Sequence, residues 1–126
     1  MVILDTSVWI EFFKTNDPFF DEVSVLLGRN EIIGLSFIFG ELLQGAKNNH
    51  ERTILREFWD ALPKMNEENV FIRAGLESGN KKWMDKGIGL IDSAILIAAR
   101  TVGARIWTLD KKLAATLSDT ESFSPC

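Results

Sequence analysis

The sequence predicts an α/β fold in which helices cover both faces of a central parallel β-sheet. Short apolar runs, partly β-branched, recur along the chain, and segments with helical spacing of apolar residues separate them. Parallel strands joined through helices need right-handed crossovers, which place helices on both sides of the sheet. The chain has 126 residues, 46% hydrophobic and 25% charged, so we expect residues 1–126 to form a single domain around one core.

In the first half of the chain, the apolar pattern predicts two strands and four helices. The strands are expected over residues 2–4 and 32–35, and the helices over residues 8–13, 18–28, 37–47 and 50–62. Thr6 or Ser7 is expected to cap the first helix. The second helix has Pro18 at its start and Gly28 at its end, which are residues favoured at those positions.

In the second half, residues 63–66 favour a loop, with a very short strand as the alternative. Asn66 is expected to cap a helix that runs to about residue 86. The segment 90–102 is apolar nearly all round, which predicts a buried helix. A strand over residues 105–109 and a short helix over 111–117 follow, and the pattern specifies the tail from residue 118 only weakly.

Four carboxylates stand in apolar surroundings. Asp5 follows the first strand, Asp110 follows the last one, and Glu41 and Asp92 lie within apolar helical segments. Each has a local explanation: Asp5 and Asp110 as helix caps, Glu41 on the wet face of its helix, and Asp92 near the positive end of its helix. Together they indicate one site, because ligands bind at the carboxyl ends of parallel strands.

Four converging carboxylates need a cation or protons. A pair about 4 Å apart repels by roughly 4 kcal/mol at an effective dielectric constant near 20. The chain has one histidine, His50, and one cysteine, Cys126, which excludes sites built on several histidines or thiolates. Oxygen ligands select Mg²⁺ or Mn²⁺, and these ions support the attack of an activated water on a phosphodiester.

Charge and cysteine content restrict the binding partners and the cellular compartment that we expect for this chain. Lys and Arg number 14 against 18 Asp and Glu, and the net charge of −4 argues against non-specific nucleic-acid binding through a basic face. A single cysteine leaves no intrachain disulfide and fits a reducing, cytoplasmic compartment. No apolar run has the length of a membrane span, so we expect no membrane association.

The motifs around the four acids resemble those of PIN-domain ribonucleases, most closely the VapC toxins of toxin–antitoxin pairs. These motifs occupy residues 3–7, 39–45, 89–99 and 107–110, and the likeness covers essentially the whole chain. The resemblance implies a PIN-like three-layer α/β/α sandwich and an endoribonuclease that depends on Mg²⁺ or Mn²⁺. Its metal-binding and catalytic residues would be Asp5, Glu41, Asp92 and Asp110.

The resemblance has further implications. Ser7, Thr6 and Thr108 would support the site through hydroxyl hydrogen bonds, and a short extra strand would lie near Pro63. The chain would form a homodimer, and a VapB-type antitoxin would occlude the site.

Lysines adjoin two of the acids. Lys111 and Lys112 follow Asp110 directly, and Lys86 precedes the break at residues 87–89 before Asp92. We regard Lys86, Lys111 and Lys112 as candidate contacts to RNA phosphates, with a solvated surface as the alternative for each.

Two alternatives to a nuclease remain. Asp5, Thr6 and Ser7 also fit a hydrolase that is phosphorylated on aspartate, although the Asp-x-Asp form expected there is missing. In a non-enzymatic interaction module, the four carboxylates would serve only as caps and ion pairs. Thermal stabilisation by Mg²⁺ or Mn²⁺ separates this module from a metal-dependent enzyme.

Overall fold

Two parallel strands, β1 (Val2–Leu4) and β2 (Arg105–Trp107), lie at the centre of the molecule. The structure is a computed structural model that describes residues 1–125. Cys126, on which the expectation of no intrachain disulfide rests, lies outside the described residues. Val2 pairs with Arg105 and Leu4 with Trp107, so both strands end at the same edge of the sheet.

Single-residue parallel bridges extend this pair on both sides: Val2 with Ile32, Gly34 with Lys64, and Ile106 with Ser122. The predicted continuous strand over residues 32–35 is wrong, because this segment changes partner. It pairs with β1 at Ile32, whereas the N–H of Gly34 donates to the carbonyl of Pro63 at 2.8 Å. The bridge at Lys64 takes the place of the very short strand expected near Pro63.

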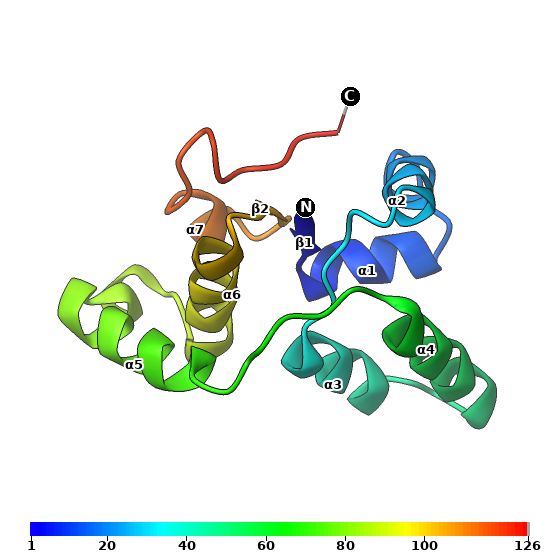
Figure 1. The fold of residues 1–126 in the computed structure, drawn as a ribbon, viewed down its shortest axis with the longest axis horizontal. Helices are drawn as coiled ribbons and strands as arrows, with labels where there is room; N and C mark the ends of the chain where they lie inside the picture. The colour runs from blue at the N-terminus through cyan, green and yellow to red at the C-terminus, as the bar shows by residue number, and fades with distance from the viewer. Residues whose placement is uncertain (126) are drawn as a thin grey trace.

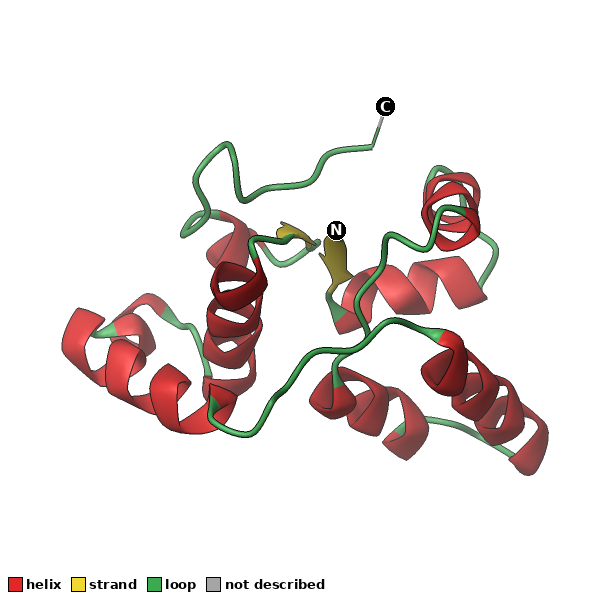
Figure 2. Cartoon of the chain, viewed as in Figure 1, coloured by secondary structure: helices red, strands yellow, loops and turns green. Residues whose placement is uncertain are grey.

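Seven α-helices and one 3₁₀ helix surround these strands within residues 1–125. They are α1 (Thr6–Phe13), α2 (Phe19–Gly28), α3 (Ser36–Gln44), α4 (Asn49–Ala61), α5 (Val70–Lys81), η1 (Trp83–Lys86), α6 (Leu90–Val102) and α7 (Lys111–Ala114). Helices α5 and α6 lie on one side of the strands and α1 to α4 on the other (Figure 1), with loops joining them (Figure 2). The predicted α/β fold with a parallel sheet is confirmed.

Helix α6 occupies the core, as its apolar sequence predicts. Its residues from Ser93 to Ala99 are all buried, and those from Ala94 to Ala99 belong to the hydrophobic cluster that contains Ile3 and Ile106 of the two strands. On the other side, α3 packs on α1 through Trp9 and Phe39, whose ring centroids are 5.2 Å apart. None of the helices in the described part of the chain combines the length and hydropathy needed to cross a membrane.

The predicted helix over residues 66–86 is interrupted. The helix begins only at Val70, and Lys82 then adopts a left-handed conformation, with φ of 55° and ψ of 44°, before η1. This turn places Trp83 in the core, where it is 3% exposed. Burial of the large indole outweighs local helix propensity, and it depends on tertiary contacts that periodicity does not contain.

The last strand and the last helix are shorter than predicted. β2 ends at Trp107, whose carbonyl accepts the N–H of Asp5 at 3.0 Å. α7 ends at Ala114, after which three-residue turns replace the helical bonds. The tail then returns beside β2, where Phe123 packs on Trp107 with ring centroids 5.1 Å apart.

Candidate active site

The four acids line one cavity at the edge where β1 and β2 end. Asp5 follows β1, Asp110 follows β2, Glu41 lies on α3 and Asp92 in the first turn of α6. The cavity lining consists of these acids with Thr6, Ser7, Ile10, Gly89, Leu90, Ile91, Ile95 and Leu109. Four segments that are distant in the sequence therefore bring carboxylates to one place.

Asp5 is held on both of its carboxylate oxygens, and its side chain is buried. Oδ1 accepts the backbone N–H of Ser7 at 2.8 Å and the hydroxyl of Ser7 at 3.1 Å. Oδ2 accepts the hydroxyl of Thr108. Asp5 is thus the N-cap of α1, as its local explanation in the sequence predicts, and the alternative that Thr6 or Ser7 caps this helix is wrong. The cap bond fixes the direction of the carboxylate.

Asp110 is the N-cap of α7. Its Oδ1 accepts the backbone N–H groups of Lys112 at 2.8 Å and Leu113 at 3.2 Å. The N–H of Asp110 itself donates to the hydroxyl oxygen of Thr108 at 3.0 Å. The predicted cap role is correct here, and it leaves Oδ2 available for a ligand.

Glu41 is tied to the start of α1. The hydroxyl of Thr6 donates to Oε1 of Glu41 at 2.9 Å, across 35 positions of the sequence. Contact between Trp9 and Phe39 holds α3 against α1, which brings these two side chains within reach. All three hydroxyl residues expected to support the site, Thr6, Ser7 and Thr108, therefore bond to an acid of the cavity.

Asp92 is half-buried and faces the negative charge of the other acids. Burial and the carboxylates of Asp110, Asp5 and Glu41 raise the pKa of Asp92 to about 6. The ion pairs within residues 1–125 join Glu77 to Lys81 and Arg100 to Glu121, so neither neutralises this site. The cavity therefore concentrates uncompensated negative charge.

The donor chemistry of the cavity fits a hard divalent cation. Its polar lining supplies carboxylate and hydroxyl oxygens, and the shared negative charge favours a cation. The carboxylates are spread apart: within residues 1–125, no three Asp, Glu, His or Cys side chains form a group that could hold a metal ion in this conformation. Repulsion between unneutralised carboxylates favours such spreading.

The lysines expected beside the acids line a different cavity. Lys86, Lys111 and Lys112 share it with Lys81 and Arg100. Sequence reasoning missed Arg100, because an arginine near the end of an apolar helix has no local mark of function. It also missed the apolar wall of the acidic cavity, since hydrophobicity alone indicates burial. This wall is formed by Ile10, Leu90, Ile91, Ile95 and Leu109.

Parallel strands that deliver acids to one edge, beside a buried helix carrying a third acid, agree with the family that the motifs resemble. The model of the PIN domain family matches residues 2–116, and the chain belongs to this family. Curated relatives are Ribonuclease VapC32 of Mycobacterium tuberculosis strain CDC 1551 / Oshkosh and of strain ATCC 25618 / H37Rv. Each is 29% identical over 123 residues, which cover 94% of this chain and 92% of the relative.

Proposed function

We propose that the protein is a VapC-type endoribonuclease that depends on Mg²⁺ or Mn²⁺ and acts as the toxin of a toxin–antitoxin pair. The observation that carries this proposal is the arrival of Asp5, Glu41, Asp92 and Asp110 at one cavity from four segments of the chain. Membership of the PIN domain family and similarity to a ribonuclease over nearly the whole chain support RNA as the substrate.

Hydrolysis adds one water across an ester bond of the RNA backbone. The water oxygen bonds to phosphorus, one P–O ester bond breaks, and the leaving oxygen takes a proton. Asp5, Glu41, Asp92 and Asp110 would hold the cation, which when bound activates water and neutralises charge on the phosphodiester. Ser7 and Thr108 orient Asp5, and Thr6 orients Glu41, so these hydroxyls preorganise the ligands.

The test is cleavage of single-stranded RNA by the purified chain in Mg²⁺ or Mn²⁺, with a chelator arm and metal add-back. We expect cleavage that stops in chelator and returns with metal. Asp5→Asn should lose it, whereas Asp60→Asn, an exposed aspartate on α4, should not. A wild-type chain that leaves RNA intact in both metals, or an Asp5→Asn variant as active as wild type, contradicts the proposal.

Two observations disfavour the alternative functions. The Asp-x-Asp form of a hydrolase phosphorylated on aspartate is missing, because Ser7 stands two positions after Asp5 and donates its hydroxyl to that carboxylate. A module of structural caps accounts for Asp5 and Asp110 but not for Asp92, whose pKa is raised to about 6 by burial and neighbouring carboxylates. A purely structural acid would gain a neutralising partner instead.

We also propose that residues 1–126 act as one cytoplasmic domain, in a homodimer that a VapB-type antitoxin inhibits. The single cysteine supports a reducing compartment. The exposed apolar side chains Ile72 and Leu76 of α5 support a homodimer, because apolar surface of this kind is favourably covered. Light scattering should give twice the chain mass, and a monomeric mass contradicts the homodimer.

A small antitoxin whose gene lies beside the gene for this chain should stop cleavage of RNA. Undiminished cleavage when the two proteins form a stable complex contradicts the inhibition.

A further inference from the structure

A second cavity, next to the acidic one along the chain, is lined by basic side chains. Its charged lining residues are all cations: Lys81, Lys86, Arg100, Lys111 and Lys112. The rest of its lining is Trp83, Ala115 and Thr116. The chain has a net charge of −4, yet five cations surround this one cavity, so the local charge is positive although the overall charge is negative. Such a group attracts an anion.

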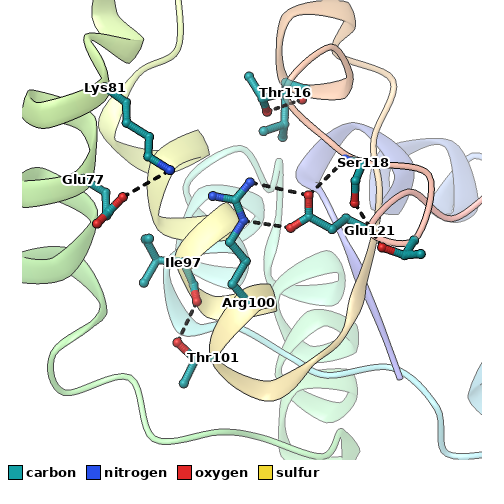
Figure 3. Close-up of polar contacts among 10 residues, drawn as sticks. Glu77, Lys81, Ile97, Arg100, Thr101, Thr116, Ser118 and Glu121 are labelled. Carbon is teal, nitrogen blue, oxygen red and sulfur yellow. Dashed lines mark hydrogen bonds and ion pairs between the residues drawn. The ribbon is translucent and has the colours of Figure 1, made fainter.

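Two of the five cations already have partners. Lys81 lies 3.6 Å from Glu77, and both side chains are exposed. Arg100 makes two contacts with Glu121, at 2.8 Å from Nε and 3.4 Å from Nη2. Figure 3 shows Lys81 and Arg100 extending from α5 and α6 toward the same space. The three cations that form no ion pair within residues 1–125 are Lys86, Lys111 and Lys112.

The walls of this cavity are held by packed elements. Trp83 is 3% exposed, and the side-chain charges of Lys81 and Arg100 each lie 5.9 Å from its ring centroid. Lys112 passes over Gly87: a Cβ at this glycine would lie 2.9 Å from both Cδ and Nζ of the lysine. The absence of a side chain at Gly87 thus lets Lys112 pack over the turn that follows Lys86.

We propose that this basic cavity binds a phosphate group of the RNA substrate, away from the bond that is cleaved. This proposal rests on the proposed function. The two cavities are lined by residues that are close in the sequence: Lys111 directly follows Asp110, and Lys86 precedes Gly89, which lines the acidic cavity. We infer that one RNA strand can place one phosphate among the acids and another phosphate among the lysines.

The chemistry of the cavity specifies the kind of contact. Ammonium groups bind phosphate oxygens without distinguishing bases, and the buried indole of Trp83 offers no free face for a base to stack on. The cavity therefore supplies affinity and direction to the strand and leaves base selection to other residues. It also offsets the repulsion that the acidic cavity exerts on RNA before a cation is bound.

The test is the affinity of the full chain for a labelled single-stranded RNA, measured by fluorescence anisotropy in a metal chelator. The variant carries Lys86→Gln, Lys111→Gln and Lys112→Gln. A charge-matched control carries Lys14→Gln, Lys47→Gln and Lys64→Gln, and all six lysines are exposed. The chelator prevents cleavage, so binding is measured independently of catalysis.

We expect the variant to bind RNA about tenfold more weakly, and the slope of log K against log salt to fall by about 0.7 in magnitude. That change corresponds to the loss of one phosphate contact on a single strand. The control should keep the affinity within about twofold. Wild-type affinity and slope in the variant, or an equal loss in the control, overturns the proposal.

Two further arms separate the possible failures. In Mn²⁺, the variant should show a raised KM with little change in kcat, because its lysines do not line the cavity of the acids. If wild type cleaves RNA and the variant keeps its KM, the phosphate site is wrong and the proposed function stands. If wild type cleaves nothing, the proposed function fails, and the chelator measurement still decides RNA binding. Inorganic phosphate bound by wild type, with RNA binding unchanged in the variant, assigns the cavity to free phosphate and overturns the proposal.

Discussion

The hydroxyl of Thr108 donates a hydrogen bond to Oδ2 of Asp5 across 103 positions of the sequence. The same hydroxyl oxygen accepts the backbone N–H of Asp110 at 3.0 Å. One threonine therefore joins the acid at the end of β1 to the acid at the end of β2. This link positions two proposed metal ligands relative to each other.

Replacing Thr108 by valine keeps the shape of the side chain and removes this link. We expect the cleavage rate to fall by at least about tenfold, and the free energy of unfolding by about 1 kcal/mol, since a hydrogen bond is lost at both acids. Thr108→Ser should restore most of the rate. Single-turnover cleavage and urea unfolding measure the two effects. If the valine variant cleaves RNA at the wild-type rate, Thr108 does not position the two acids for cleavage.

Asp92→Asn tests whether the cavity holds a cation. In the metal-free protein near neutral pH, this change removes repulsion among the acids, so we expect the free energy of unfolding to rise by about 1 kcal/mol. Wild type should gain about 1.4 kcal/mol at a metal concentration about ten times Kd, and the variant should gain less. Thermal melts with and without Mg²⁺ or Mn²⁺ measure both. Equal metal responses in the two proteins contradict the site.

The acids were recognisable in the sequence because their surroundings are apolar. Asp5 and Asp110 stand at strand ends, and Asp92 lies in a helix with almost no polar face. Local sequence could not decide between cap and ligand for Asp5 and Asp110, since the two uses differ only in which carboxylate oxygen is engaged. The structure shows Oδ1 of each in a cap bond.

Other parts of the fold depend on contacts that are distant in the sequence. The break at Lys82 serves the burial of Trp83, and no glycine or proline marks this position. The change of pairing partner at Gly34 depends on the position of Pro63, which follows α4 and accepts the N–H of Gly34. The pairing of Ser122 with Ile106 depends on the whole chain, so residue periodicity leaves the tail undetermined.

Gly87→Ala tests the turn beneath Lys112. The glycine has φ of 78°, and an added Cβ would meet the lysine side chain at 2.9 Å. We expect the free energy of unfolding to fall by about 1–2 kcal/mol, with weaker binding of RNA in chelator. The matched control is Gly75→Ala in α5, where a Cβ meets nothing within 4 Å. This variant should gain up to about 1 kcal/mol from helix propensity. An unchanged free energy of unfolding in Gly87→Ala contradicts the expected backbone strain at this position.

The ion pair of Arg100 with Glu121 predicts a pH dependence. Hydrogen bonding to Arg100 lowers the pKa of Glu121 to about 2, against an ordinary value of 4.5. Because the folded pKa is the lower one, the pair stabilises the fold fully above pH 4.5, and this contribution is lost as the pH falls toward 2.

Glu121→Gln should therefore lower the free energy of unfolding at pH 7 by up to about 1 kcal/mol. The difference from wild type should shrink steadily in denaturant melts taken between pH 5 and pH 3. Glu68→Gln, at an exposed glutamate, should show no such trend. A difference that stays constant across this range contradicts the assignment.

The central claim is that four acids act as one site, and single-turnover RNA cleavage in Mn²⁺ tests it most directly. The variants are Asp5→Asn, Glu41→Gln, Asp92→Asn, Asp110→Asn and the double variant at Asp5 and Asp110. Asparagine also caps helices well, so the caps of α1 and α7 survive. We expect each single variant to lose at least about 10²-fold, and the double variant to lose much less than the product of the two single losses. Wild-type cleavage by any folded single variant contradicts the claim.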